Sequence, residues 1–268
     1  MRKKKSLGQN FLIDHTVARD MADAISVSPS DTVFEIGPGE GALTQELLVR
    51  GARVVAVEKD ARLIPLLRER FAADIERESL TLIEGDALQE TPDACSLPEG
   101  YVVAANVPYY ISGELLRMLF SQSRLPSRAV LLLQKEVVER IVARGGKESV
   151  LSLSVQAYGS PKKVRTVLSG AFRPIPGVDS AILLVENISR SRIAPFEDTF
   201  FTLVKAGFSE KRKRLQKNLE KVVAAPAVAH AFEALSIPQD IRAENLSFAE
   251  WRTLVQTLAP SIHSTGAA

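Results

Sequence analysis

The sequence predicts a doubly wound α/β domain followed by a small all-helical domain. Between residues 32 and 133, short β-rich runs alternate with single helical stretches, which is the pattern of successive βαβ units. The strand runs are almost continuously apolar, as expected for a parallel sheet that is covered on both faces. After about residue 189 the sequence keeps helical spacing alone. We therefore expect one domain over residues 1–189 and a helical domain over residues 190–268.

The elements of the first domain follow in order. Strands are expected over residues 32–36, 53–58, 80–83, 101–105 and 129–133. The leucines of residues 42–50 share one helical face, and Asp60 is a suitable N-cap for a helix that ends near residue 71. A loop that contains Pro174, Pro176 and Gly177 leads to a sixth strand over residues 181–185.

In the second domain, helical spacing covers residues 195–208, 210–223, 227–235 and 247–258. Ser247 and Glu250 have the spacing of a capping box, which predicts the start of the last helix.

Composition limits the possible classes of function. The 268 residues are 46% hydrophobic and 25% charged, which is ordinary globular chemistry and excludes a disordered or fibrous chain. The single cysteine, Cys95, excludes an internal disulfide and a Cys-based zinc cluster, and its polar loop argues against a thiolate nucleophile. His15, His230 and His263 share no ligand spacing, so we expect no metal site. Because neither a secretion signal nor a membrane-spanning segment is visible, we expect a cytoplasmic protein.

A glycine-rich loop between the first strand and the first helix is a candidate ligand site. Gly37, Gly39 and Gly41 allow close backbone approach, and the helix that follows offers free N–H groups. Glu58 ends the second strand, where a carboxylate can accept both hydroxyls of a ribose. The G-x-G-x-G spacing differs from the dinucleotide fingerprint, and Glu40 would repel a pyrophosphate. This favours S-adenosylmethionine over NAD, with a tight turn of a non-binding protein as the alternative.

Polar residues also follow the third and fourth strands. Asp86 could accept a hydrogen bond from an adenine amino group, or it could be an ordinary turn or N-cap residue. An amino group on a nucleobase is a poor nucleophile because its lone pair is delocalised into the ring. The Asn106 amide oxygen and the carbonyl of Val107 or Pro108 could accept its two N–H bonds and make the nitrogen nucleophilic, while Tyr109 offers a flat surface for the base. A strand-ending turn with core tyrosines is the alternative.

Phe172 begins a proline-stiffened segment over residues 172–180. Its ring could stack on the other face of a target base, or the segment could be a stiff loop without a binding role. The residues alone favour neither reading.

Basic residues gather in residues 1–12, 161–173 and 205–221. Together these segments hold fifteen basic and two acidic residues, although the whole chain has a net charge of only +2. One such run is usually a solvated helix face, but all three together could form a surface that tracks phosphates. The candidate RNA contacts are Lys3, Lys4, Lys5, Lys211, Arg212, Lys213 and Arg214.

With these motifs, the sequence resembles the ribosomal RNA adenine N6-dimethyltransferases, and most closely their bacterial small-subunit branch. The resemblance runs from Gly8 to about residue 258. Its carriers are residues 8–12, 35–44, 57–58, 84–86, 106–109, 172–181 and 208–215. Two positions depart from the family pattern, because Val107 stands where Leu or Ile is commoner and Gly177 where a Lys is common.

The resemblance implies a Rossmann-like methyltransferase domain with a helical RNA-binding domain after it, and S-adenosylmethionine as the cofactor. It implies that Gln9, Asn10 and Leu12 lie at the cofactor. Gly37, with Gly39 in the same loop, would meet the methionine part, Glu58 the ribose and Asp86 the adenine.

For the reaction, the resemblance implies that Asn106, with Pro108 fixing the backbone, touches both the cofactor and the target amino group. Phe172 and Tyr109 would sandwich the flipped adenine. The implied product is two adjacent N6,N6-dimethyladenosines in the RNA of an assembling small subunit. Because the sequence shows no exposed apolar heptad or edge, we expect a monomer. The alternatives are a large-subunit methyltransferase that confers macrolide resistance, a non-catalytic RNA-binding assembly factor, and an NAD-dependent oxidoreductase.

Overall fold

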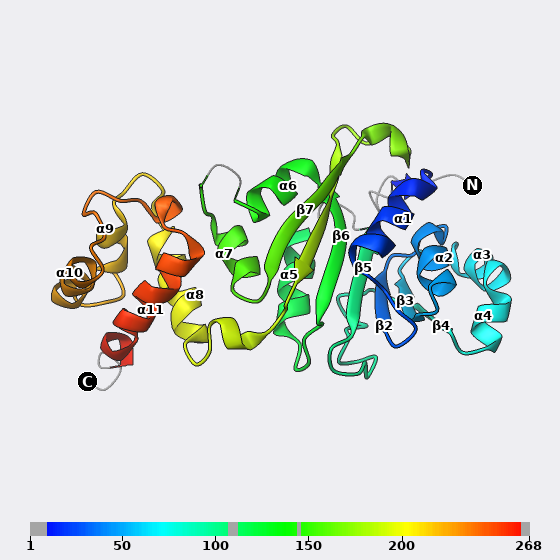
Figure 1. Cartoon of the computed structure of the whole chain (residues 1–268), viewed down its shortest axis with the longest axis horizontal. Coiled ribbons are helices and arrows are strands. Elements are labelled where there is room, and N and C mark those ends of the chain that lie inside the picture. The colour runs from blue at the N-terminus through cyan, green and yellow to red at the C-terminus, as the bar shows by residue number, and fades with distance from the viewer. Residues whose placement is uncertain (1–9, 107–111, 144–145, 264–268) are drawn as a thin grey trace. The chain divides into compact units, whose positions relative to one another are not determined.

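A computed structural model describes residues 10–106, 112–143 and 146–263 of the protein (Figure 1). The chain divides into two compact units, of which the first comprises residues 1–138 and 160–188 and the second residues 139–159 and 189–268. The sequence placed residues 139–159 in the first domain, whereas their contacts join them to the second unit. The predictions for Lys3, Lys4, Lys5, Gln9, Val107, Pro108 and Tyr109 lie outside the described residues.

The first unit is built on a mostly parallel sheet, which confirms the predicted α/β class. Its seven strands run in the order β4-β3-β2-β5-β6-β9-β7, and β9 pairs antiparallel with both β6 and β7 (Figure 1). The strands are β2 (Thr32–Ile36), β3 (Arg53–Glu58), β4 (Leu80–Glu84), β5 (Val102–Asn106), β6 (Arg128–Gln134), β7 (Ser160–Val167) and β9 (Ser180–Glu186). A separate two-stranded sheet joins β1 (Phe11–Leu12) to β8 (Phe172–Arg173).

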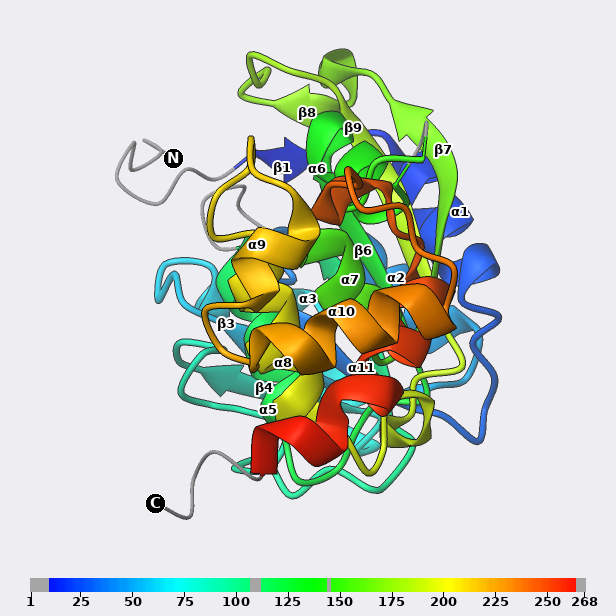
Figure 2. The same ribbon diagram turned by 90° about the vertical axis from the view of Figure 1, so that its left-hand side faces the viewer.

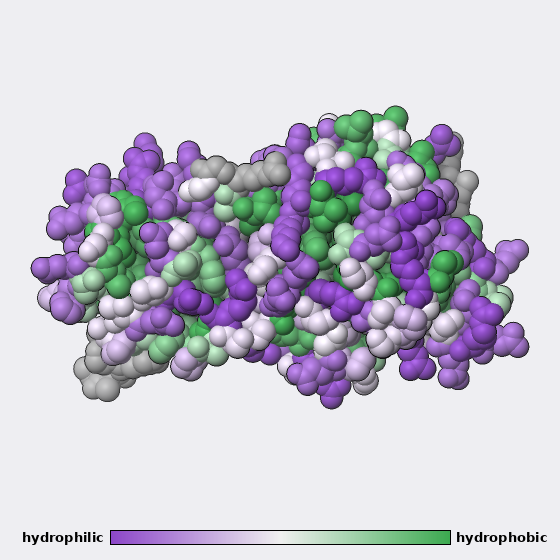
Figure 3. Space-filling view, in the orientation of Figure 1, coloured by the Kyte–Doolittle hydropathy of each residue, from purple (hydrophilic) through white to green (hydrophobic). Residues whose placement is uncertain are grey.

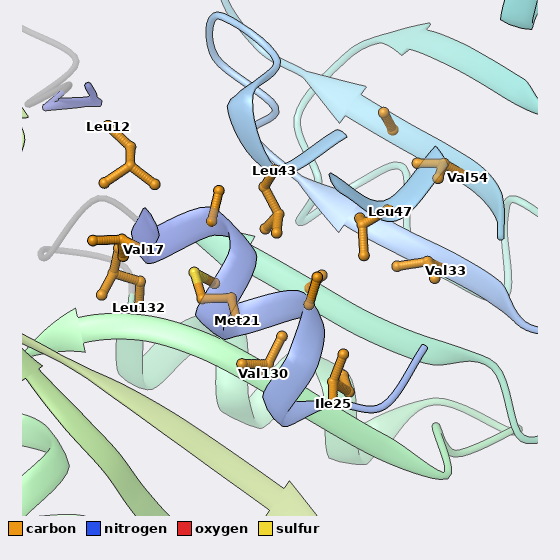
Figure 4. Close-up of a cluster of buried hydrophobic side chains, with 14 of the residues drawn as sticks. Leu12, Val17, Met21, Ile25, Val33, Leu43, Leu47, Val54, Val130 and Leu132 are labelled. Carbon is orange, nitrogen blue, oxygen red and sulfur yellow. The ribbon is translucent and has the colours of Figure 1, made fainter. Parts of the chain in front are cut away.

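Successive side chains of a strand point to opposite faces of the sheet, and the side chains on both faces of the main sheet are buried. On one side, Val33 of β2 and Val130 of β6 belong to a core cluster that includes Met21 of helix α1 (Figure 4). On the other side, Phe34 and Val103 are also fully buried. The helices of this part of the chain are α1 (His15–Ala24), α2 (Ala42–Val49), α3 (Ile64–Arg70), α4 (Ala72–Glu76), α5 (Ser112–Ser121) and α6 (Lys135–Ile141).

The second unit is helical in its described residues, and Figure 2 faces several of its helices. Trp251 is fully buried and donates its indole N–H to the carbonyl oxygen of Ala243 at 3.2 Å. The capping box is present, since the backbone N–H of Ser247 donates to the Glu250 carboxylate at 2.8 Å. The helices are α7 (Val150–Gln156), α8 (Glu197–Gly207), α9 (Leu215–Leu219), α10 (Ala225–Ala234) and α11 (Phe248–His263).

Two expected helices are shorter than their sequence patterns. The helix expected from Asp60 begins at Ile64, because the Asp60 side chain closes a turn by accepting from the backbone N–H of Arg62 at 3.2 Å. The helix expected over residues 210–223 is reduced to α9, since residues 208–214 form a turn. Among the helices that the structure describes, none combines the length and the apolarity that a bilayer-spanning segment needs.

Candidate cofactor site

The candidate site lies at the carboxyl edge of the sheet, where parallel strands end side by side. Ile36 of β2 pairs with Val57 of β3 and with Ala105 of β5, while Glu58 pairs with Glu84 of β4. The residues that follow these strands therefore share one edge. They include the glycine loop at residues 37–41, Glu58, Asp86 and Asn106, as the sequence predicted from strand ends alone.

The glycine loop has a backbone that favours glycine. Gly37, Gly39 and Gly41 have φ angles of +66°, +61° and +84°, which side chains rarely tolerate. The N–H of Gly37 donates to the carbonyl oxygen of Val57 at 2.9 Å, which ties the loop to the end of β3. A Cβ on Gly41 would lie 2.5 Å from the ring of Phe71, so this glycine is also required by packing.

Glu58 is held at the end of β3 by two backbone groups. One carboxylate oxygen accepts the N–H of Gly39 at 3.1 Å and the other accepts the N–H of Asp60 at 2.8 Å. Burial raises the pKa of Glu58, and these hydrogen bonds oppose that shift. Each carboxylate oxygen has a further lone pair, so Glu58 can still accept a hydroxyl group while its geometry is fixed.

Asp86 closes the turn after β4 and carries an ion pair that the sequence analysis missed. One of its oxygens accepts the N–H of Leu88 at 3.1 Å, and the other lies 2.5 Å from Nζ of Lys59. The N–H of Gly85 donates to the carbonyl oxygen of Glu58 at 2.9 Å, which joins the two strand ends. The sequence held no signal for this ion pair, because it follows from the register of Glu58 with Glu84, which brings Lys59 near Asp86.

The N-terminal strand reaches the same edge. The side-chain amide of Asn106 donates to the carbonyl oxygen of Asn10 at 3.5 Å. The ring of Phe11 packs against the glycine loop, since a Cβ on Gly39 would lie 3.3 Å from it. Leu12 is buried and pairs with Phe172. Sequence reasoning placed Asn10 and Leu12 near a cofactor through the resemblance, but it did not single out Phe11.

Phe172 is a core residue in this structure. Its side chain is 2% exposed and belongs to the cluster that contains Val17, Leu132 and Ile182. Stacking on a base therefore requires that part of this ring be uncovered. By contrast, Leu168 and Ile175 in the same connection are 69% and 70% exposed, and Figure 3 shows apolar side chains at the tip of the connection between β7 and β9.

Two of the three basic segments can be followed in the structure. In β7, Lys162 pairs with Glu186 at 2.6 Å and Arg165 pairs with Asp20 at 2.5 Å, so much of that strand's charge is neutralised locally. In the second unit, residues 211–214 lie in the exposed turn before α9, and Lys213 pairs with Glu210 at 2.9 Å.

Comparisons with known proteins agree with this architecture. A family model described as ribosomal RNA adenine dimethylase matches residues 1–260. The chain is 41% identical to the ribosomal RNA small subunit methyltransferase A of Deinococcus radiodurans, covering 96% of this chain and 86% of the relative. It is 38% identical to the protein of the same name from Dehalococcoides mccartyi strain CBDB1, covering 95% and 88%. The chain belongs to the ribosomal RNA adenine dimethylase family.

Solved structures show the same fold. A dimethyladenosine transferase from Plasmodium falciparum matches with a TM-score of 0.82 and 27% identity over 94% of this chain and 98% of that one. The 23S rRNA methyltransferase ErmE matches with a TM-score of 0.79 over 93% and 100%, and its 24% identity supports the fold alone.

As a member of its family, this dimethylase uses S-adenosylmethionine to methylate adenosines of ribosomal RNA. The residues at the sheet edge fit that cofactor. A Cβ on Gly37 would lie 3.9 Å from the carbonyl oxygen of Asn106, so the glycine at this position keeps the backbone accessible beside the end of β5. Glu58 and Asp86 supply carboxylate acceptors on neighbouring strand ends, which suits the hydroxyl and amino groups of an adenosine.

Glu35 of β2 precedes Gly37 by two residues and is 1% exposed. Burial raises its pKa to about 8, the nearby charge of Glu58 adds to the shift, and Thr44 partly opposes it. At neutral pH this carboxyl group is therefore mostly protonated, so Glu35 does not add a second buried negative charge near Glu58.

Proposed function

We propose that this chain transfers methyl groups from S-adenosylmethionine to N6 of two adjacent adenosines in small-subunit ribosomal RNA, giving N6,N6-dimethyladenosine. We place the reaction on the assembling small subunit in the cytoplasm and assign it to a monomer. The relatives named small subunit methyltransferase A support the choice of RNA. The observation that carries the chemistry is the position of Asn106 at the end of β5, beside the glycine loop and Asn10.

The side-chain amide of Asn106 is oriented so that it can accept a hydrogen bond from the substrate rather than donate one. Its amide nitrogen donates to the carbonyl oxygen of Asn10, so the amide oxygen is directed elsewhere and can accept an N–H of the target amino group. Accepting that N–H draws the nitrogen lone pair out of the ring. A nitrogen held in this way is nucleophilic: it would accept the methyl group of a cofactor held by Glu58, Asp86 and the glycine loop, and its proton would pass to solvent.

The cofactor assignments follow the strand ends. S-adenosylmethionine, when bound, supplies an electrophilic methyl group on a sulfonium centre. Glu58 would hold the ribose and Asp86 the adenine, while Gly37 and Gly39 would let the methionine part approach the backbone. We also propose that Gln9, Asn10 and Leu12 cover the bound cofactor and that Pro108, Tyr109 and Phe172 hold the target base.

Substituting Asn106 tests this mechanism. We expect Asn106→Ala to abolish methyl transfer to small-subunit RNA while fluorescence anisotropy still shows RNA binding within a few-fold of the wild type. Thr81→Ala, at an exposed position in β4, is a control that keeps full activity. Unchanged methyl transfer by Asn106→Ala would refute the assigned role.

Mapping the modified adenosines identifies the RNA. In a strain that lacks this gene, mass spectrometry of both ribosomal RNAs should show loss of dimethyladenosine from the small-subunit RNA and its return on complementation. Loss from the large-subunit RNA instead would favour the resistance-type methyltransferase. Binding of RNA and cofactor without any product would favour a non-catalytic assembly factor.

A further inference from the structure

The turn between α8 and α9 is held in one shape from within the second unit. Asn218 of α9 is 1% exposed, and its side-chain amide donates to the carbonyl oxygens of Gly207 at 2.7 Å and Glu210 at 3.1 Å. At the end of the turn, the N–H of Leu215 donates to the carbonyl oxygen of Ile241 at 2.8 Å. One buried amide therefore ties the start and the middle of the turn to the helix that follows.

Charges in the same segment are sorted into paired and unpaired groups. Glu210 accepts from Lys221 at 2.6 Å and from Lys213 at 2.9 Å. Lys221 also donates to the hydroxyl of Ser209 at 3.0 Å, which adds a second tie across the turn. These two lysines and one glutamate connect parts of the turn and keep a net charge of +1, so most of the unpaired positive charge of the turn lies on its other basic residues.

The remaining basic residues of the turn face solvent. Lys211, Arg212 and Arg214 are exposed, and within the part of the chain that the structure describes no carboxylate forms an ion pair with them. Three like charges on four consecutive residues repel one another and favour an anionic partner with several charges. Closely spaced phosphates, as in an RNA backbone, match that pattern better than a single carboxylate.

A fixed turn binds better than a flexible one, because less conformational entropy is lost when the partner arrives. We infer that Asn218 is a positioning residue for RNA binding, which acts by holding the turn that presents Lys211, Arg212 and Arg214 to the phosphate backbone. The inference rests on the proposed function in that ribosomal RNA is the partner. It adds that a buried amide, that of Asn218, sets the arrangement of three basic residues already expected to contact RNA.

Asn218→Asp is the appropriate test, since the side chain keeps its size but loses both N–H donors. Gln122→Glu is a matched control in the other unit, because Gln122 is also a buried amide that donates to a helix carbonyl, that of Met118, at 2.8 Å. Binding would be measured by fluorescence anisotropy with the wild-type RNA substrate, a 3′-terminal small-subunit fragment, between 50 and 300 mM salt. Thermal melts would confirm that each variant is folded at the assay temperature.

We expect Asn218→Asp to raise the RNA Kd by about tenfold near 100 mM salt and to reduce the slope of log Kd against log salt by about 1 to 2, as loss of one or two phosphate contacts predicts. Gln122→Glu should leave both quantities unchanged. The Kd for S-adenosylmethionine should stay constant in both variants, because the cofactor site lies at the sheet edge of the other unit.

A second variant separates positioning from general destabilisation. The triple substitution Lys211→Ala, Arg212→Ala and Arg214→Ala should reproduce the loss of salt slope, and adding Asn218→Asp to it should cause little further loss, because both changes remove the same contacts. A wild-type salt slope for folded Asn218→Asp, or fully additive losses in the combined variant, would overturn the inference. If the salt effects appear but small-subunit RNA is not methylated, the proposed target is wrong and the role of Asn218 stands.

Discussion

Nζ of Lys59 lies 2.5 Å from Oδ2 of Asp86, so the carboxylate that we assign to the adenine of the cofactor is already ion-paired. The hydrogen bond from Lys59 is the main reason that the pKa of Asp86 is below its usual value, and the N–H of Leu88 acts in the same direction. Lys59 follows Glu58 directly in the chain. The adjacent residues Glu58 and Lys59 therefore link the carboxylate that we assign to the ribose with the carboxylate that we assign to the adenine.

Replacing Lys59 tests this coupling. In Lys59→Met the pKa of Asp86 should rise toward its ordinary value, so the carboxylate becomes protonated at a higher pH than in the wild type. We expect the affinity for S-adenosylmethionine, measured by calorimetry from pH 6 down to pH 3, a range that spans the ordinary aspartate pKa of 3.8, to fall at a higher pH in the variant. Lys162→Met, which removes the ion pair between Lys162 of β7 and Glu186 of β9, is the control. Superimposable pH profiles for Lys59→Met and the wild type would contradict the coupling.

Gly41→Ala should destabilise the first unit for two physical reasons. The residue has a φ of +84°, and the new Cβ would lie 2.5 Å from the Phe71 ring. Strain of the backbone and overpacking together predict a loss of about 2 to 4 kcal/mol in the free energy of unfolding. Urea denaturation measures this loss.

A second substitution at Phe71 identifies the source of the loss. Combining Gly41→Ala with Phe71→Leu should restore part of the difference relative to Phe71→Leu alone, because the smaller side chain makes room for the Cβ. If the two changes are additive, the backbone conformation accounts for the whole cost.

The sequence was sufficient to predict the edge of the sheet where the site lies. The parallel strands have apolar runs that end at the glycine loop, Glu58, Asp86 and Asn106, and their carboxyl ends must meet. The contacts between these residues were not predictable. The pairing of Leu12 with Phe172, and of Lys59 with Asp86, depends on register and on side-chain reach across segments that are far apart in the chain.

Strand β7 was missed for a related reason. It is an edge strand with Lys162, Lys163 and Arg165 among its residues, and its register shifts between Lys163 and Arg165, so its sequence lacks a continuous apolar run.

The prediction of one helix over residues 210–223 was wrong for a different reason. Its spacing is helical, but the buried Asn218 holds residues 207–210 by their carbonyl oxygens, and this tertiary contact overrides local preference.

Phe172 gives a test that separates packing from catalysis. Because the ring is 2% exposed, Phe172→Leu should lower the free energy of unfolding by about 1 to 2 kcal/mol. If the ring also stacks on the target adenine, kcat should fall well beyond this effect when methyl transfer is measured far below the melting temperature. Phe120→Leu, at a buried position on α5, is the control for packing loss alone. Equal activities for the two variants would leave Phe172 with a structural role and remove it from the base-binding set.

Glu35→Gln tests whether Glu35 is protonated in the folded protein. The folded-state pKa of Glu35 is raised to about 8, whereas in the unfolded chain it titrates near its ordinary value of 4.5. Between these values folding takes up a proton, so wild-type stability falls as pH rises, by up to about 1.4 kcal/mol per pH unit. Glutamine is neutral in both states, and the variant lacks this dependence.

The stability of Glu35→Gln relative to the wild type should therefore increase from pH 5 to pH 8 and stay level above that. Any cost of placing the extra N–H bonds of glutamine shifts the whole curve without changing its slope. Urea unfolding at pH 5, 6.5 and 8 measures the difference, with Glu69→Gln at an exposed position as the control. A difference that does not change with pH would mean that Glu35 is ionised in the folded protein. The end of the sheet would then hold two buried negative charges, those of Glu35 and Glu58, which would favour the positive sulfonium of the cofactor.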